Sequence, residues 1–481
     1  MSRRHLAGAA IAACTALLVT SCSTTVQGMA VSVFDDPFRV AGMPAVDGPT
    51  GLRPDASEPS RDVENTDGGE IDELAAAAIS DIEDFWQTAY PETFDREFTL
   101  VEALISWDAT GFDNQAFCES DTYGLVNAGF CPLDDTIGWD RGELFPALRD
   151  NFGEIAVTNV LAHEYGHAIV HQANLNKRGT PTLVAEQQAD CLAGVYMRWV
   201  AEGNSQRFTL STGEGLNKLL AAEISFRDPV LSEDDYDTGE DEHGSAFERI
   251  TAFQFGFTDG AASCAAIDVR EIGQRRGDLP VELQTDQTGE WPVSEESVQA
   301  VFEALEIMFA PANPPRLSLD AESAADCPDA RPSPPVSYCP ATNTIAVDLP
   351  ELEVKGAQSE EQNGGLVSGD NSAYSVLASR YMLAVQHERG GLVLDNAEAA
   401  LRTACLTGVA TTKMTKAVTT SDGNTVALTA GDLDEAVSGL LTDGLAASDV
   451  NGETVPSGFS RMDAFRTGVL GDEERCFKRF P

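Results

Sequence analysis

The segment HEYGH, from His163 to His167, has the residue types and spacing of a hydrolytic zinc site. In a helix, side chains at positions i and i+4 lie on one face, so His163 and His167 could bind one metal ion. Glu164 would then lie beside the metal-bound water and could take its proton during attack on a carbonyl group. The alternative is a histidine pair on an ordinary helix, because so short a motif also arises by chance.

Two acidic residues follow on a second predicted helix, TLVAEQQADCLAGVYMRWVAEG. Glu186 and Asp190 are four residues apart and therefore share a helix face. We expect Glu186 to be the third zinc ligand, which leaves the fourth tetrahedral position for water. Asp190 could accept the free ring N–H of a ligating histidine. Isolated acids would suggest only a solvated helix face, but their position after HExxH favours a metal site.

Both segments need helices to position them. The residues around HEYGH, FGEIAVTNVLAHEYGHAIVHQANL, have apolar positions at roughly helical spacing and contain no proline. A further helical pattern begins near Ile71 with IDELAAAAISDIEDFWQTAY. Residues 22–70 are instead rich in Ser, Thr, Gly, Pro and Asp and predict a flexible tether.

The N-terminus is typical of a targeting segment. A basic start, with Arg3 and Arg4, precedes an apolar run that is too short to span a bilayer comfortably. The run ends in VTSC, which resembles a bacterial lipobox with Cys22 as the lipidated residue. We expect a lipoprotein signal peptide over residues 1–21 and an exported protein of the cell envelope, anchored to the outer face of the cell membrane. A plain secretory signal is the alternative.

The formal net charge of −47 argues against nucleic acid or anionic membrane surfaces as partners, since both would repel the chain. We therefore expect contact with the membrane only through the N-terminal lipid anchor. The expected partner is a peptide or protein substrate in the cell envelope.

The chain repeats itself at a period of about 210 residues. Four segments recur in the same order, which predicts two tandem domains, over residues 71–275 and 290–481. The matched segments are FCPLDDTIGWD with YCPATNTIAVD, LAHEYGHAIVHQ with LASRYMLAVQHE, DCLAG with ACLTG, and FERITAFQFGFTDGAASC with FSRMDAFRTGVLGDEERC.

The cysteines follow the repeat. Of the ten in the chain, Cys14 and Cys22 belong to the N-terminal segment, and the other eight fall at matching positions of the two copies. An even number in an exported protein predicts disulfides, and identical closure of both domains leaves three connectivities. We favour the one with the shorter loops, although some thiols could instead be free and buried. It pairs Cys118–Cys131, Cys191–Cys264, Cys327–Cys339 and Cys405–Cys476.

The segments LAHEYGHAIV, EQQADCLAG and HGSAFERITAFQFGF resemble the bacterial putative neutral zinc metallopeptidase family, which carries HExGH, LQADC and HGS motifs. The resemblance covers about residues 75–265, and Gln187 stands where the family usually has leucine. It implies a zincin-like fold and a zinc-dependent hydrolase. We accordingly expect an α+β protein with two zincin-like metallopeptidase domains, of which the second lacks the metal site.

The second copy serves as an internal control. It keeps framework residues such as Tyr381, the counterpart of Tyr165, but lacks all the proposed metal-binding and catalytic residues. This loss favours a true zinc site in the first copy and a pseudoenzyme domain in the second. The counterparts of His163, Glu164, His167, Glu186 and Asp190 are Ser379, Arg380, Leu383, Ala400 and Ala404.

Two further histidines are sorted by the same comparison. His243 begins the HGS segment and aligns with Val455, so it disappears together with the ligands. This favours a catalytic role near the oxyanion over that of a surface residue in an acidic loop. His171 aligns with His387 and is retained, which favours a structural role. Arg249 is likewise retained, as Arg461, and is expected to serve the fold.

These observations favour a lipid-anchored, extracytoplasmic zinc peptidase that uses Zn²⁺ and Glu164 as general base to hydrolyse peptide bonds. One alternative is a binding or scaffolding lipoprotein that keeps the metal for stability without turnover. Structural zinc sites usually have four protein ligands, which ranks this alternative lower. A zinc hydrolase acting on a non-peptide amide is a third possibility.

Overall fold

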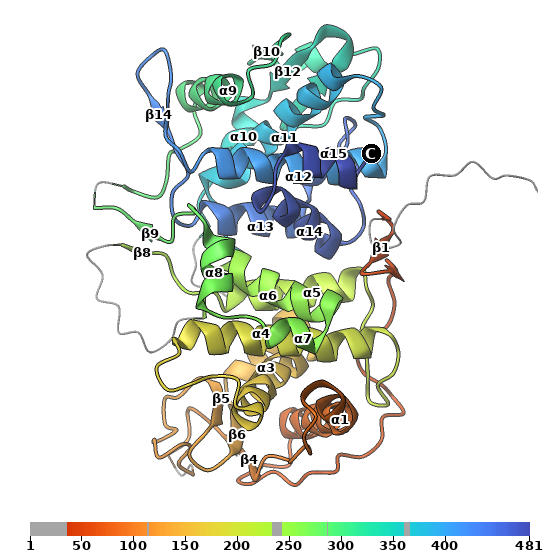
Figure 1. Ribbon diagram of the computed structural model, residues 1–481, viewed down its shortest axis with the longest axis vertical. Helices are drawn as coiled ribbons and strands as arrows, with labels where there is room; N and C mark the ends of the chain where they lie inside the picture. Colours follow the sequence, from red (N-terminus) through yellow and green to blue (C-terminus); the bar gives the residue numbers. More distant parts are fainter. Residues whose placement is uncertain (1–35, 113–114, 233–242, 286, 360–365) are drawn as a thin grey trace, which may run out of the picture. The chain divides into compact units, whose positions relative to one another are not determined.

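The computed structural model describes residues 36–112, 115–232, 243–285, 287–359 and 366–481. The predicted signal peptide and Cys22 lie outside these residues. Within the part of the chain that is described, helices and strands are mixed as expected for an α+β protein (Figure 1). No helix among these residues is both long and apolar enough to cross a lipid bilayer.

The first half is built on a three-stranded sheet of β4 (Ala103–Trp107), β5 (Ala128–Cys131) and β6 (Thr136–Asp140). β6 lies in the centre, parallel to β4 and antiparallel to β5, so β5 forms one edge. The helix α3 (Glu154–Ala173) packs against both β5 and the long helix α1 (Glu70–Phe94).

Three helices of the first half lie beside one another and position the predicted site: α3, α4 (Thr182–Ala201) and α6 (Ala246–Asp259) (Figure 1). The glycine of HEYGH, Gly166, lies where α3 and α4 are in close contact. A β-carbon there would lie 2.9 Å from the Ala189 backbone on α4, so only glycine allows α3 and α4 to approach so closely. This contact brings the HEYGH segment of α3 beside the AEQQADC segment of α4.

The second half contains a sheet with the same order and directions, formed by β10 (Arg316–Ser318), β12 (Thr344–Val347) and β11 (Val336–Cys339). Its long helices are α11 (Asp370–Arg389) and α12 (Ala397–Lys413), followed by α13 (Asp432–Thr442) and α14 (Gly458–Val469). α12 packs against both α11 and α14.

Shorter elements connect these parts. The helices are α2 (Leu144–Phe152), α5 (Glu214–Ser225), α7 (Ala261–Cys264), α8 (Val269–Arg276), α9 (Glu295–Phe309), α10 (Leu349–Lys355) and α15 (Glu473–Arg479), with 3₁₀ turns η1 (Ala321–Ala324), η2 (Pro340–Thr342) and η4 (Leu445–Ala447). The two-residue strands are β1 (Arg39–Val40), β2 (Met43–Pro44), β3 (Gly51–Leu52), β7 (Phe208–Thr209), β8 (Leu231–Ser232), β9 (Glu282–Leu283), β13 (Val418–Thr419) and β14 (Thr425–Val426).

Four disulfides link the same cysteines that the repeat argument paired. They are Cys118–Cys131, Cys191–Cys264, Cys327–Cys339 and Cys405–Cys476. Disulfides of this number indicate an oxidising, extracytoplasmic environment.

The prediction of a flexible tether is wrong for residues 36–69. Here β3 pairs with β7, and the Leu52 N–H donates to Glu154 Oε2 over 2.8 Å. Arg61 forms an ion pair with Glu83, and Val40 is fully buried. The polar composition suggested a solvated chain, but this segment is held by hydrogen bonds and ion pairs rather than by a sustained apolar face.

The two halves touch through helices on each side. The Phe247 N–H at the start of α6 donates to Asp434 of α13, and the Gln254 amide of α6 donates to the Phe459 carbonyl of α14.

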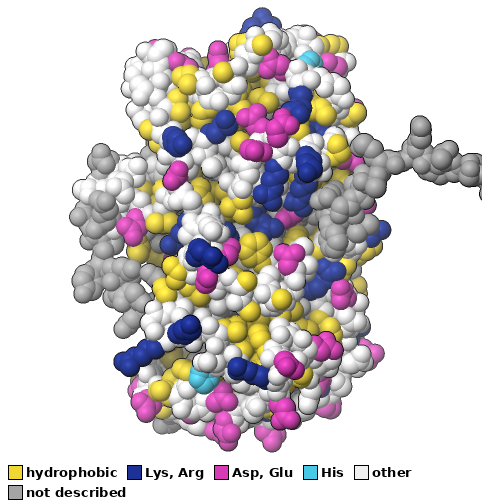
Figure 2. All heavy atoms as spheres, viewed as in Figure 1, with side chains coloured by type: hydrophobic (Ala, Val, Ile, Leu, Met, Phe, Trp, Pro, Cys, Tyr) yellow, Lys and Arg dark blue, Asp and Glu magenta, His cyan; other side chains and the backbone are white. Residues whose placement is uncertain are grey.

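On the face drawn in Figure 2, basic side chains are interspersed with acidic and neutral ones.

Candidate metal centre

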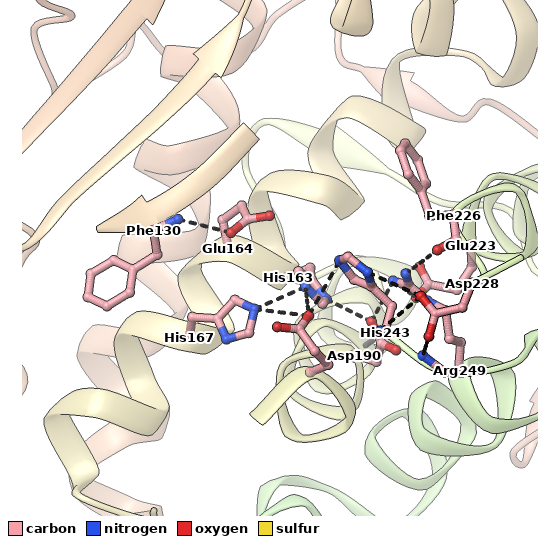
Figure 3. A network of polar contacts seen from close by, with 12 residues as sticks. Phe130, His163, Glu164, His167, Asp190, Glu223, Phe226, Asp228, His243 and Arg249 are labelled. Carbon is pink, nitrogen blue, oxygen red and sulfur yellow. Dashed lines mark hydrogen bonds and ion pairs between the residues drawn. The ribbon is translucent and has the colours of Figure 1, made fainter. Parts of the chain in front are cut away.

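The residues of HEYGH and AEQQADC meet between α3 and α4 (Figure 3). His163 Nε2 lies 3.1 Å from His167 Nε2 and 3.2 Å from Glu186 Oε2. The third side of this triangle, from His167 Nε2 to Glu186 Oε2, is 3.4 Å. The structure therefore brings the three predicted ligands together, with their donor atoms converging on one point.

The distances between the three donor atoms fit zinc. Zinc binds nitrogen and oxygen ligands at about 2.0–2.2 Å in a tetrahedron, so two ligand atoms lie about 3.3–3.6 Å apart. The three observed separations lie within this range or at most about 0.2 Å below it. Two imidazoles and one carboxylate are also a common donor set of catalytic zinc, with the fourth position open.

Asp190 contacts the first of the predicted ligands. His163 Nδ1 lies 2.7 Å from Asp190 Oδ1, and both side chains are buried. Because an ionised carboxylate can only accept, the proton is assigned to Nδ1, and the Nε2 lone pair is then directed at the metal position. Asp190 thus has the predicted geometry of a residue that fixes the orientation of a ligand.

The electrostatics of the site favour a cation. Burial alone would lower the pKa of His163, but Asp190, Glu186 and Glu164 outweigh it and raise this pKa well above its usual value. Burial would raise the pKa of Glu186, but His167 and His163 lower it overall. A group of carboxylates that holds a proton on a buried imidazole also attracts a metal ion, which would replace that positive charge.

Glu164 lies outside the ligand triangle and faces the edge strand. Its Oε2 accepts a hydrogen bond of 3.0 Å from the backbone N–H of Phe130 on β5. It lines a cavity of about 430 Å³ together with His163, His167 and Glu186. A carboxylate with one oxygen fixed by the strand is thus beside the metal position in an open cavity.

His243 lines the same cavity, and Figure 3 shows it beside His163. Its Nε2 lies 3.7 Å from Glu186 Oε2, and its Nδ1 lies 3.6 Å from Asp228 Oδ1. Burial would lower the pKa of His243, but the contact with Asp228 contributes to a net increase. The histidine singled out by the repeat is therefore close to the ligands although it is about 80 residues away in sequence.

His171 lines the same cavity without joining the ligands. Its ring lies 5.8 Å from that of Phe130. In the second half, the ring of His387 lies 6.2 Å from that of Tyr338. Tyr338 occupies the strand position that corresponds to Phe130. An aromatic contact present in both halves supports the structural role expected for His171.

Arg249 supports the site in a way that its sequence position did not predict. Arg249 was expected only to serve the fold, but its Nη2 donates to Asp190 Oδ1 over 2.8 Å and to Glu223 Oε1 over 2.8 Å. Asn159 donates to the second oxygen of Glu223 over 2.7 Å. Arg249 therefore holds the carboxylate that orients His163. Its presence in the HGSAFER segment was the only signal, and Glu223 had none.

We expect Asp190→Ala to weaken zinc binding by roughly 10–100-fold, because it removes the partner that fixes His163. Competition with a chromophoric chelator measures this change. Asp81→Ala is a matched control, since Asp81 is a buried carboxylate of the first half that binds Tyr196 and Arg207 rather than a ligand. Equal zinc affinity in both variants would contradict the role assigned to Asp190.

Comparison with known proteins identifies the family of the chain. A family model described as "Putative neutral zinc metallopeptidase" matches residues 3–267. No curated protein and no solved structure matches the chain significantly. The matched region covers more than half of the chain and contains the three predicted ligands as well as Glu164, Asp190 and His243. The protein belongs to the putative neutral zinc metallopeptidase family.

Proposed function

We propose that the protein is a zinc-dependent peptidase whose active site lies in the first domain, residues 71–275. The observation that carries this proposal is the triangle of His163, His167 and Glu186 donor atoms, open to a cavity that Glu164 also lines. Three protein ligands and one open position are typical of catalytic zinc, whereas structural sites are closed by four.

His163, His167 and Glu186 would hold the metal. Bound zinc would supply a Lewis acid for the substrate carbonyl and would lower the pKa of water at the site. Glu164 takes the proton of the attacking water and passes it to the leaving amine. The Phe130 N–H holds one oxygen of Glu164, which leaves the other oxygen for the proton.

His243 is placed to stabilise negative charge. Its raised pKa favours a positively charged ring, and the ring lies beside Glu186 at the cavity wall. A cationic donor there can bind the oxygen that becomes negative when water attacks a carbonyl. We therefore assign His243 to the oxyanion rather than to the metal.

The edge strand β5 supports a peptide as substrate. It borders the cavity through Ala128, Gly129 and Phe130, and its other side is paired to β6. The Phe130 N–H points away from β6, toward Glu164, so the carbonyl of the same residue faces outward too. Because the Phe130 N–H is hydrogen-bonded to Glu164, an extended peptide would pair with this edge through the outward carbonyl.

We also propose that the two halves are tandem copies of one fold. Support comes from the shared strand order and from disulfide loops of similar span, 13 and 73 residues in the first half and 12 and 71 in the second.

Arg380, the counterpart of Glu164, is fully buried and donates to the Val336 carbonyl of the edge strand β11. In the first copy the Glu164 carboxylate accepts a hydrogen bond from the edge strand, whereas in the second copy the Arg380 guanidinium donates one to it. No histidine-containing ligand group occurs among the described residues of 290–481. This domain is therefore proposed to be a pseudoenzyme that has lost the zinc site.

We also propose that the protein is anchored by a lipid at Cys22 and acts on a peptide or protein substrate in the cell envelope. The disulfides support the oxidising compartment that this location requires. The lipobox-like VTSC segment is the support for the anchor. Mass spectrometry of the N-terminal peptide from the native host would detect a diacylated Cys22.

Incubation of the zinc-loaded protein with a peptide library, with products identified by mass spectrometry, tests the proposed activity. We expect cleavage that stops after removal of zinc by a chelator and returns when zinc is added. A zinc-loaded protein that cleaves no peptide would contradict the proposal. That result would favour a metal-stabilised binding lipoprotein, or a hydrolase of another amide.

A further inference from the structure

The second half contains three carboxylates that the proposed peptidase does not use. Oxygens of Glu290, Asp370 and Glu435 all lie within 4.8 Å of one another. Asp370 and Glu435 are buried, with 5% and 4% of their surface exposed, and Glu290 is half-buried. The three residues come from the segment before α9, the first residue of α11 and the first turn of α13.

Each carboxylate is held by one backbone N–H. Asp370 Oδ2 accepts from the Trp291 N–H, and Glu290 Oε2 accepts from the Asp370 N–H over 3.2 Å. Glu435 Oε2 accepts from the Asn371 N–H over 2.8 Å. In every case one oxygen is fixed by the backbone and the second oxygen remains for another partner.

The second oxygens of these carboxylates have no partner among the described residues that offsets their charge. Asp370 Oδ1 is buried and has no hydrogen-bond partner. A β-carbon added at Gly369 would lie 2.3 Å from Glu435 Oε1 and 2.7 Å from Glu290 Oε1, so both of these oxygens face the same side of the Gly369 backbone. Glu290 and Asp370 also line a cavity of about 510 Å³, which gives access to water.

In the described part of the chain, no ion pair offsets the charge of this cluster. Among the described residues, no Lys, Arg or His forms an ion pair with Glu290, Asp370 or Glu435. Burial, together with the neighbouring carboxylates, raises the pKa of Asp370 to about 7 and of Glu435 to about 9. Helix capping does not account for this arrangement, because capping uses only one oxygen of each carboxylate and leaves Asp370 Oδ1 buried and unpaired.

We propose that Glu290, Asp370 and Glu435 form a binding site for a hard divalent cation, Ca²⁺. All three ligands are oxygens, which suit Ca²⁺ and Mg²⁺ rather than zinc or copper. Mg²⁺ is usually bound through one or two carboxylates, whereas Ca²⁺ accepts more of them in irregular geometry. The cation would tie the connecting segment at Glu290 to the N-terminal ends of α11 and α13. This site is independent of the proposed peptidase activity.

Calorimetric titration of Ca²⁺ into the full oxidised chain tests the site. The protein is first treated with chelator and then reloaded with zinc, so that the zinc ligands are occupied, and about 0.15 M salt screens weak binding to the acidic surface. We expect one Ca²⁺ per chain, with a dissociation constant of about 10⁻⁴–10⁻³ M or tighter, and a higher midpoint of thermal unfolding.

Asp370→Asn and Glu435→Gln keep the shape of each side chain and remove its charge. We expect each to weaken Ca²⁺ binding roughly tenfold or more while one zinc per chain is retained. Asp449→Asn is the matched control, because Asp449 is a buried carboxylate of the same half outside the cluster, and it should bind Ca²⁺ as the wild type does. Absence of Ca²⁺ binding by the folded wild type, or unchanged binding by both cluster variants, would overturn the proposal.

Discussion

Glu164→Gln should bind zinc as the wild type does and hydrolyse peptides about 10²–10⁴-fold more slowly. The amide has nearly the shape of the carboxylate, so the ligand triangle of His163, His167 and Glu186 is left unchanged. It cannot take a proton from water, and the step that Glu164 performs is lost. Zinc content by elemental analysis and kcat/KM on a cleaved peptide measure the two effects separately.

Glu97→Gln is the matched control for this variant. Glu97 is an exposed glutamate of the same domain, so the same chemical change is made away from the cavity. We expect zinc content and turnover equal to those of the wild type. Full turnover by Glu164→Gln on any substrate that the wild type cleaves would show that the proposed mechanism is wrong.

Single replacement of a ligand should remove both the metal and the activity. We expect His163→Ala, His167→Ala and Glu186→Ala each to weaken zinc binding by more than the roughly 10–100-fold predicted for losing the hydrogen-bond partner of a ligand. The reason is that two remaining donors cannot complete a tetrahedral site with one open position. Zinc per chain after dialysis and the rate of peptide hydrolysis should fall together.

His387→Gln is the control for this series. It removes a histidine of the second half, which contacts the Tyr338 ring and belongs to no ligand group among the described residues. One zinc per chain and normal hydrolysis are expected. Retention of zinc by all three ligand variants would place the metal elsewhere, and loss of zinc from His387→Gln would show that the second half binds it.

The metal-binding residues could be predicted from the sequence because their geometry is local. His163 and His167, like Glu186 and Asp190, are separated by one helical turn, and a spacing of four residues fixes their shared face once the helix is known. The contact that joins the two helices is not local, but the glycine of HEYGH permits it. His243 stood out because it begins the HGS segment, and its replacement by Val455 in the second copy favoured a catalytic role.

The rest of the network could not be predicted, because no spacing rule connects its members. Arg249 reaches Asp190 from α6, and Glu223 reaches Arg249 from α5, through packing that the sequence does not encode as a motif. The same holds for the carboxylates of the proposed Ca²⁺ site, which come from three distant segments. The prediction of a flexible tether was wrong for residues 36–69 for a different reason. Their composition is typical of a solvated linker, and hydrogen bonds to distant residues such as Glu154 hold them in place.

The most direct test of a catalytic zinc site is X-ray diffraction at the zinc absorption edge from crystals of the full chain. We expect one strong anomalous peak in the first domain, about 2.0–2.2 Å from His163 Nε2, His167 Nε2 and a Glu186 oxygen, with no fourth protein ligand. A peak enclosed by four protein ligands would indicate a structural site, and the absence of zinc at these three residues would contradict the account.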